Sequence, residues 1–495
     1  MTKELIDFTI GITAHSEGIL AHKTMLSIFE AAKLLDKHKV SYEIIINIDN
    51  GDTVTKKYFS RYAKHPKIKI LNSTFADLGL SRNNIVKMAK GKYISFLDAD
   101  DLISADWYYS AYQLLSQSKE PILVHPEISY SFGPNHEPPA IWRQQDSYDR
   151  ATNAFLLCSV NCWVSTIAGP KSIFEKYPYP KTEHGYGNED LGFNIATISA
   201  NIPHKVADGT VLFYRRKASN SLLSANNMSQ LTQRYSDLFN IDYFKNLDPL
   251  DTKLPDFRPD LFSKPVPKSS RSVVYRHGSK VYRAIKKNTL ADRIITPVAY
   301  RVVGFSNRVR NHINNSNGAN IQFPDTIIDA AKKASAIDNV LYPTIDKING
   351  ATSYYPEAQV EFSIVYHRLI QPVTRHPDQI IIVDSIKPNM ENIKKILVKS
   401  PKKHFAIIVT KKGTSSQYAH QLPNNCDIID FAKEATYINV ANYQRLFTML
   451  ITQLQCHDLH IINSEFAFSW VNNHQELIEY NYHAKIISGD LEITL

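Results

Sequence analysis

Short apolar runs separated by helix-like segments organise the N-terminal part of this chain. The runs Phe8–Thr13, Glu43–Ile48, Ile68–Leu71 and Tyr93–Leu97 are rich in β-branched and aromatic residues, which favours short buried strands. Between them, apolar residues recur with the period of an α-helix. Strands that alternate with helices at this spacing predict an α/β domain, in which a mostly parallel sheet carries helices on both faces.

Helices are predicted between these strands and after the last one. Apolar residues from Ile19 to Leu35 define a long helix, and a shorter one is expected at about 54–63. For the next helix, Ser81 is the predicted N-cap and Gly91 the C-terminal stop. A further helix is expected to begin near Ser104.

The run Tyr93–Leu97 ends in three carboxylates, Asp98, Asp100 and Asp101. An unpaired buried carboxylate is costly, so these acids should emerge at the C-terminal end of the strand, where α/β sheets bind ligands. Mg²⁺ and Mn²⁺ take oxygen ligands and often bridge carboxylates to substrate phosphates. The segment is therefore either a metal–diphosphate site or an acidic loop that caps the helix near Ser104.

Polar loops also follow the first and second predicted strands. They are Ala14–Gly18 and Asp49–Asp52. Because the carboxyl ends of parallel strands meet at one edge of a sheet, both loops should lie beside Asp98.

Several segments, in a fixed order, resemble the family 2 glycosyltransferases, which have the GT-A fold, a nucleotide-sugar-binding domain with a Rossmann-like mixed sheet. The order matters because a lone Asp-x-Asp is common, and the resemblance covers about residues 6–225. The segments are Thr13–Glu17, Ile48–Asp52, Gly79–Asn83, Tyr93–Asp101, Gly185–Phe193 and the closing strand Thr210–Arg216.

The resemblance implies roles for the acids and for the nucleotide-binding residues. In such enzymes the Asp-x-Asp segment, here Asp98-Ala99-Asp100, contacts the ribose and the metal, and Asp100 is the direct ligand of Mn²⁺ or Mg²⁺. The turn Asp49-Asn50 corresponds to the acid that accepts a hydrogen bond from uracil, and either residue could read the base.

Further positions correspond to residues around the nucleotide. His15, between Thr13 and Glu17 of the first loop, either stacks on the base or is a solvated loop histidine. Arg82 either reaches the base or diphosphate or is a surface charge on its helix. The closing pair Arg215-Arg216 would grip the diphosphate as a guanidinium fork. No convincing third metal ligand is evident, and His204 is only a guess.

Glu189-Asp190 is the predicted source of general-base catalysis beside the nucleotide-binding and metal-binding residues. Sugar transfer to a hydroxyl needs a group that takes the proton, and a carboxylate in hydrogen-bond reach can do so. The pair follows Gly185-Tyr186-Gly187 and starts a predicted helix, so it is either the base, with Asp190 preferred, or a plain helix N-terminal charge pair. The family inverts the anomeric carbon.

The excess of positive charge lies in one segment. The chain has 57 Lys and Arg against 48 Asp and Glu, a net charge of +9. Residues 264–311 hold twelve of these cations and one acid, Asp292. This segment predicts a basic amphipathic helix that either binds an anionic membrane surface or bridges domains with its charges in water. Nucleic acid is not expected, because no recognition module accompanies the charge.

The chain length of 495 residues allows two or three domains. The expected organisation is a GT-A catalytic domain at 1–225, a polar and then basic helical connector at 226–320, and a smaller Rossmann-like α/β domain at 321–495. The last domain resembles, less specifically, the N-terminal half of a GT-B glycosyltransferase. Without the nucleotide-binding half, it is a scaffold, an acceptor-holding module or a truncated second enzyme.

The strands expected in the last domain come from short apolar runs. They are Gln379–Val383, Phe405–Val409, Asp427–Ile429, Leu459–Ile462 and Lys485–Ile487.

Together these observations predict an inverting, metal-dependent glycosyltransferase. It would move a sugar from a UDP-sugar to a glycan or lipid-linked glycan acceptor in bacterial surface polysaccharide synthesis, such as O-antigen, capsule or teichoic-type polymer. The alternative is a non-catalytic binding or assembly module that kept the fold. No apolar run reaches eighteen residues and no signal peptide is evident, so we expect a cytoplasmic protein, either free or peripheral on the inner face of the plasma membrane.

Overall fold

The protein is described here from a computed structural model. The structure describes residues 6–133, 140–217, 231–247, 325–341, 352–354, 361–411, 413, 416–438, 440–488 and 491–494. The predicted basic segment 264–311 lies outside these residues, as does most of the predicted connector 226–320. The domain limits at 225 and 320 therefore stay predictions.

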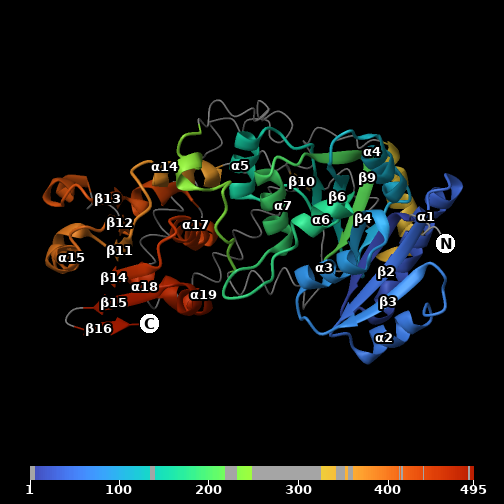
Figure 1. Cartoon of the computed structure of the whole chain (residues 1–495), viewed down its shortest axis with the longest axis horizontal. Helices are drawn as coiled ribbons and strands as arrows, with labels where there is room; N and C mark the ends of the chain where they lie inside the picture. The colour runs from blue at the N-terminus through green and yellow to red at the C-terminus, as the bar shows by residue number, and fades with distance from the viewer. Residues whose placement is uncertain are drawn as a thin grey trace, which may run out of the picture. The chain divides into compact units, whose positions relative to one another are not determined.

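The first four strands of the chain are parallel and lie next to one another at one end of a ten-stranded mixed sheet (Figure 1). These are β1 (Ile6–Ala14), β2 (Tyr42–Asp49), β3 (Ile68–Ser73) and β4 (Gly91–Asp98), in the order β4-β1-β2-β3. All four predicted strands are confirmed. Their register brings Thr13 of β1 level with Asp98 of β4, which aligns the polar ends of the strands.

The remaining strands make this sheet mixed. β4 pairs antiparallel with β8, β5 with β9, and β6 with β7, whereas the long β6 and β9 run parallel. The α/β class and the mixed sheet implied by the resemblance are confirmed, and the longest pairings in it are parallel. The bounds are β5 (Leu102–Ile103), β6 (Leu123–Phe132), β7 (Ala140–Arg143), β8 (Ala168–Pro170), β9 (His204–Arg215) and β10 (Thr352–Tyr354), which pairs with β7.

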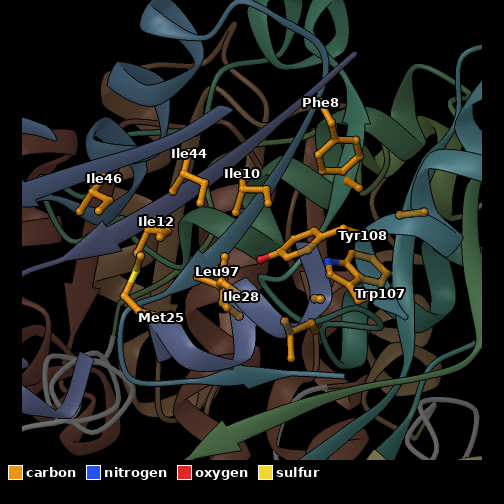
Figure 2. Packing of buried hydrophobic residues seen from close by; sticks show 14 of the residues in the cluster. Phe8, Ile10, Ile12, Met25, Ile28, Ile44, Ile46, Leu97, Trp107 and Tyr108 are labelled. Atoms are coloured by element: carbon orange, nitrogen blue, oxygen red, sulfur yellow. The ribbon is translucent and has the colours of Figure 1, made fainter. Parts of the chain in front are cut away.

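Helices cover both faces of the sheet, as predicted. On one face, α1 and α4 supply Met25, Ile28, Trp107 and Tyr108, which Figure 2 shows against the strand residues Ile10, Ile12, Ile44, Ile46 and Leu97. On the other face, α3, α6 and α7 supply Ile85, Phe174 and Phe193. Burial of such side chains stabilises the fold by about 1.5–3 kcal/mol each.

The helices that accompany the first sheet range in length from the four residues of α9 to the seventeen of α1. They are α1 (Ala21–Lys37), α2 (Thr53–Ser60), α3 (Leu78–Met88), α4 (Trp107–Gln117), α5 (Arg150–Ser159), α6 (Lys171–Lys176), α7 (Glu189–Ser199), α9 (Ile241–Phe244) and α12 (Asp325–Ile337). α12 contacts β9 and α1.

Both predicted boundaries of α3 were wrong. α3 begins at Leu78 because Asp77 is its N-cap and accepts a hydrogen bond from Leu80 N at 2.7 Å, so Ser81 lies inside the first turn. Gly91 does not end this helix but opens β4. α4 begins at Trp107, and β5 intervenes between it and the acidic triplet. The acids therefore do not cap α4.

A second sheet of six strands follows (Figure 1). Its order, β13-β12-β11-β14-β15-β16, is parallel except for the last pair. This confirms a second, smaller α/β sheet, with the predicted strands in place. The strands are β11 (Gln379–Val383), β12 (Phe405–Val409), β13 (Cys426–Ile429), β14 (Asp458–Ile462), β15 (His483–Ser488) and β16 (Leu491–Thr494).

Helices precede and separate the strands of the second sheet along the chain. They are α14 (Glu361–Ile370), α15 (Ile386–Lys399), α16 (Phe431–Glu434), α17 (Val440–Gln453), α18 (Glu465–Asn473) and α19 (Gln475–Asn481). Across the described residues, none of the helices combines the length and the apolar character needed to cross a membrane.

Candidate functional site

The polar ends of β1 and β4 meet at one edge of the first sheet. Thr13 Oγ1 donates to Asp98 Oδ1 at 2.5 Å, and Ala99 N donates to Thr13 O at 2.9 Å. Ala99 is buried, and its carbonyl accepts from Thr24 Oγ1 of α1, which fixes the turn after β4. The structure thus brings the predicted Asp-x-Asp segment to the expected edge of the sheet.

Arg82 connects Asp98 with Glu189. Its side chain is fully buried, and it donates to Asp98 Oδ1 at 3.2 Å and to Glu189 Oε1 at 2.9 Å. The interpretation of Arg82 as a surface helix charge was therefore wrong. Burial lowers its pKa, but Asp98 and Glu189 outweigh that effect and raise it, so the guanidinium stays charged.

The two acids at the start of α7 differ in their partners. Burial raises the pKa of Glu189 to about 7, against the opposing effect of Arg82 and with help from Asp190. Asp190 is half-buried, and its Oδ2 accepts from Asn161 Nδ2 at 2.9 Å. Burial raises the pKa of Asp190 as well, again against Arg82. A raised pKa strengthens a carboxylate as a general base near neutral pH.

Asp49, at the end of β2, holds the loop after β3. Its carboxylate accepts from Ser73 Oγ at 2.9 Å, from Phe75 N at 2.7 Å and from Asp77 N at 3.1 Å. The side chain is buried, whereas the next residue, Asn50, is exposed with φ 48°. Asp49 is thus a structural brace, and Asn50 is the more accessible of the two residues.

His15 and Glu17 occupy the loop after β1. His15 is exposed, and its Nδ1 lies 2.6 Å from Asp49 O. Glu17 Oε2 accepts from His15 N at 2.6 Å. Burial raises the pKa of Glu17, against the opposing effects of the His15 N–H and Lys217. The loop therefore places an exposed ring beside β2 and a carboxylate beside β9.

Asp98, Asp100 and Asp101 together form one edge of the first sheet, which we call the acidic edge. Asp100 Oδ2 lies 2.8 Å from Lys217 Nζ. Asp101 Oδ1 accepts from Arg215 N at 2.7 Å, while its buried Oδ2 has no hydrogen-bond partner among the described residues. Burial raises the pKa of Asp101 well above the ordinary value, and the charges of Asp100 and Asp98 add to this effect.

The closing arginines differ in what they contact. Arg215 is buried; its Nε donates to Asp100 O at 2.7 Å, and its guanidinium pairs with the buried Asp338. Asp338 also accepts from Lys23 Nζ at 2.6 Å. Arg216 is exposed, and its backbone N donates to Phe132 O at 2.7 Å. Of the pair, Arg216 has the accessible side chain.

The acidic edge fits a divalent ion in part. Within the described ranges, no group of three or more His, Cys, Asp or Glu side chains is arranged to hold a metal. The Lys217 ammonium on Asp100 shows, however, that this edge holds a cation. Such a site suits Mg²⁺ or Mn²⁺, which use one or two carboxylates together with substrate phosphates.

His204 does not belong to this edge. His204 is the first residue of β9, whereas Asp101 contacts Arg215, the last residue of this strand. Its ring is buried between His125 at 2.9 Å and Thr197 Oγ1 at 2.9 Å, and burial holds its pKa well below the ordinary value. The suggestion of His204 as a third ligand was wrong.

Sequence comparison finds a known family in the N-terminal part of the chain. Residues 9–177 match the family model described as glycosyl transferase family 2. The chain carries a family 2 glycosyltransferase domain. The match begins inside β1, includes β2 to β4 and the Asp98–Asp101 turn, and ends before α7. No curated protein sequence matches the chain.

Solved structures similar to this chain are distant. One is S. aureus TarS 1–349 in complex with UDP-GlcNAc, at 12% identity and TM-score 0.35, which covers 74% of this chain and 88% of that one. Another is the mannosyltransferase PcManGT from Pyrobaculum calidifontis in complex with GDP-Man and Mn²⁺, at 13% identity and TM-score 0.33, covering 45% and 61%.

A further match, TarS 1–349 on its own, has 13% identity and TM-score 0.32 and covers 42% of this chain and 60% of that one.

The sequence did not single out three residues of this edge. Lys217 directly follows Arg215-Arg216, so the run of cations was a usable signal. Asn161 and Asp338 gave no local signal, because they reach the edge only through the packing of distant segments.

Proposed function

We propose that this protein is an inverting, metal-dependent glycosyltransferase that uses a UDP-sugar. The observation that carries the proposal is that the ends of β1 and β4, which lie in the segment matched by the family 2 model, converge with the start of α7. Arg82 pairs with Asp98 and Glu189, which are close neighbours of Asp100 and Asp190 in the chain, and this supports a shared site for the two acids. A metal-binding acid and a base are the two groups that the reaction requires.

The donor would lie across the carboxyl ends of β1, β2 and β4. His15 and Asn50 are accessible toward the base, while Asp49 fixes the loop on which they rest. Asp98 would contact the ribose, and Asp100 the metal–diphosphate. Arg216 is the accessible arginine for the diphosphate, because Arg215 is engaged by Asp338.

The chemical step is a displacement at the anomeric carbon. An acceptor hydroxyl oxygen forms the new C–O bond as the bond to the diphosphate oxygen breaks, and the bonding pair leaves with UDP. Asp190 accepts the hydroxyl proton, which is worth roughly 10²–10⁴-fold in rate. Asn161 keeps the Asp190 carboxylate oriented. A bound Mn²⁺ or Mg²⁺ would supply charge stabilisation to the leaving diphosphate.

The acceptor and location belong to the same proposal. We infer a glycan or lipid-linked glycan acceptor of a bacterial surface polysaccharide, handled in the cytoplasm. The cationic segment 264–311 would hold the enzyme against an anionic membrane surface. The second α/β sheet would serve as a scaffold or acceptor-holding module.

The rival function is a non-catalytic nucleotide-sugar-binding module. One observation is compatible with it: Asp98 and Asp100 are already paired with Arg82 and Lys217. The two functions differ in turnover, because a binding module would bind UDP-sugars without releasing UDP.

The test is UDP release from a panel of UDP-sugars with Mn²⁺ and a glycan acceptor. We expect release by wild type, none above background by Asp100→Ala, and a loss of about 10²–10⁴-fold in kcat with Asp190→Asn at unchanged UDP affinity. Asp146→Ala is the matched control, since Asp146 is exposed and pairs with Lys205 at 2.8 Å. UDP binding without release would favour the binding module, and a thermal shift with GDP or dTDP but not UDP would reject the donor.

A further inference from the structure

The cations around the acidic edge are not equally available. Arg82 is fully enclosed between Asp98 and Glu189, and the Arg215 guanidinium pairs with the buried Asp338. Lys217 lies at the rim: its Nζ is 2.8 Å from Asp100 Oδ2 and 3.6 Å from Glu17 Oε1.

The exposure of the three side chains separates fixed cations from a movable one. The Arg82 and Arg215 side chains are 1% and 6% exposed, whereas that of Lys217 is 31% exposed. Lysine carries a compact ammonium on a flexible stem, with three donors that can be redirected. An ion pair at the rim is weak, so its exchange for another partner costs little.

We propose that Lys217 exchanges partners during donor binding, from the carboxylates of Asp100 and Glu17 to the diphosphate of the UDP-sugar. This inference rests on the proposed function. Without donor, the ammonium neutralises two acids that would otherwise repel each other. With donor, Asp100 Oδ2 is needed for the metal, and the nearest new anion for the ammonium is the diphosphate.

The exchange follows from the geometry of one oxygen. An ammonium at 2.8 Å from Asp100 Oδ2 occupies the space in which a divalent ion would sit, and two cations in that space repel. Glu17 stays in place when Lys217 leaves, because its other oxygen accepts from His15 N at 2.6 Å. Lys217 is therefore a competitor of free metal and a partner of metal-bound diphosphate.

These two roles predict opposite effects of one substitution. In Lys217→Met, Mn²⁺ alone should bind about threefold more tightly, because a rim ion pair of this kind no longer competes. UDP with saturating Mn²⁺ should bind about tenfold more weakly, because a charged hydrogen bond to the diphosphate is lost. Manganese EPR titration and calorimetry measure the two dissociation constants without turnover.

Two variants control this experiment. Lys217→Arg keeps the charge and should retain UDP affinity within about threefold. Lys205→Met removes a lysine of β9, the strand that precedes Lys217, and Lys205 also pairs with an aspartate at 2.8 Å; both affinities should stay at the wild-type values.

The outcomes separate this inference from the proposed function. If wild type binds Mn²⁺ and UDP but Lys217→Met leaves either constant unchanged, or weakens Mn²⁺ alone, the exchange is wrong. If wild type binds neither ligand and Asp100→Asn matches it, the proposed function itself fails, and this inference fails with it.

Discussion

At the scale of single residues, Arg82 sets the charge balance of the acidic edge. One buried guanidinium lies between Asp98 and Glu189, with Asp190 close enough to affect its pKa. Three acids therefore share one buried cation. Its positive charge does not outweigh the effect of burial on the pKa of Glu189. This explains why the pKa of Glu189 rises to about 7 although an arginine contacts it.

The raised pKa of Glu189 predicts a pH-dependent stability. The folded state binds a proton more tightly than the unfolded chain, so its contribution is full below about pH 4.5 and is lost as the pH rises to about 7. In Glu189→Gln, which cannot ionise, this loss should disappear, a difference on the order of 2 kcal/mol between pH 4.5 and 8. Urea unfolding at the two pH values measures it.

Glu175→Gln is the control, because that glutamate is exposed. An equal pH dependence in wild type and Glu189→Gln would contradict the assignment.

At the scale of elements, the end of β9 is held by the chain segment after α12. Asp338 follows this helix directly, is fully buried, and pairs with Lys23 of α1 and Arg215 of β9. Burial raises its pKa, but hydrogen bonds from Lys23 and Arg215 outweigh burial and lower it. A segment far along the chain thereby fixes the strand that leads to Arg216 and Lys217.

Asp338→Asn should destabilise the protein by about 3 kcal/mol, because it leaves a buried arginine without its counterion. Since the pKa of Asp338 is lowered, its contribution is present above about pH 4 and is lost as the pH falls through the lowered value. The penalty measured by urea unfolding should therefore shrink in acid.

Asp329→Asn, on the exposed side of the same helix, serves as the control. A penalty no larger than that of the control would show that the pair with Arg215 does not stabilise the fold.

At the scale of the whole molecule, residues near the C-terminus support the loop before the predicted base. His184 N donates to Glu476 Oε1 at 2.8 Å, and His184 O accepts from Asn481 Nδ2 at 3.0 Å. The His184 ring stacks on Tyr480 with the ring centroids 4.1 Å apart. α19 thus fixes the backbone that leads into Glu189 and Asp190, which gives the C-terminal region a role in the geometry of the edge.

Gly185→Ala tests this contact against a matched glycine. A Cβ at Gly185 would lie 2.5 Å from Leu477 Cβ, whereas one at Gly209 would meet nothing closer than 3.7 Å. Both glycines have positive φ, +79° and +77°, so both substitutions carry the same backbone penalty of about 1 kcal/mol. We expect Gly185→Ala to lose about 1–3 kcal/mol more stability, and kcat with it.

Equal losses of stability and of kcat in the two variants would contradict a supporting role for α19. Urea unfolding and UDP release measure the two quantities.

The sequence by itself determined the order of strands and helices and the position of the acids at the end of β4, because both follow from local patterns of apolar and charged residues. The sequence also contains, in the expected order, the segments that resemble family 2 glycosyltransferases. Only the tertiary structure decided which cation meets which acid: Arg82 with Glu189, Arg215 with Asp338, and Lys217 with Asp100. Partners so far apart in the chain are chosen by how helices pack on the sheet, and no local pattern encodes that packing.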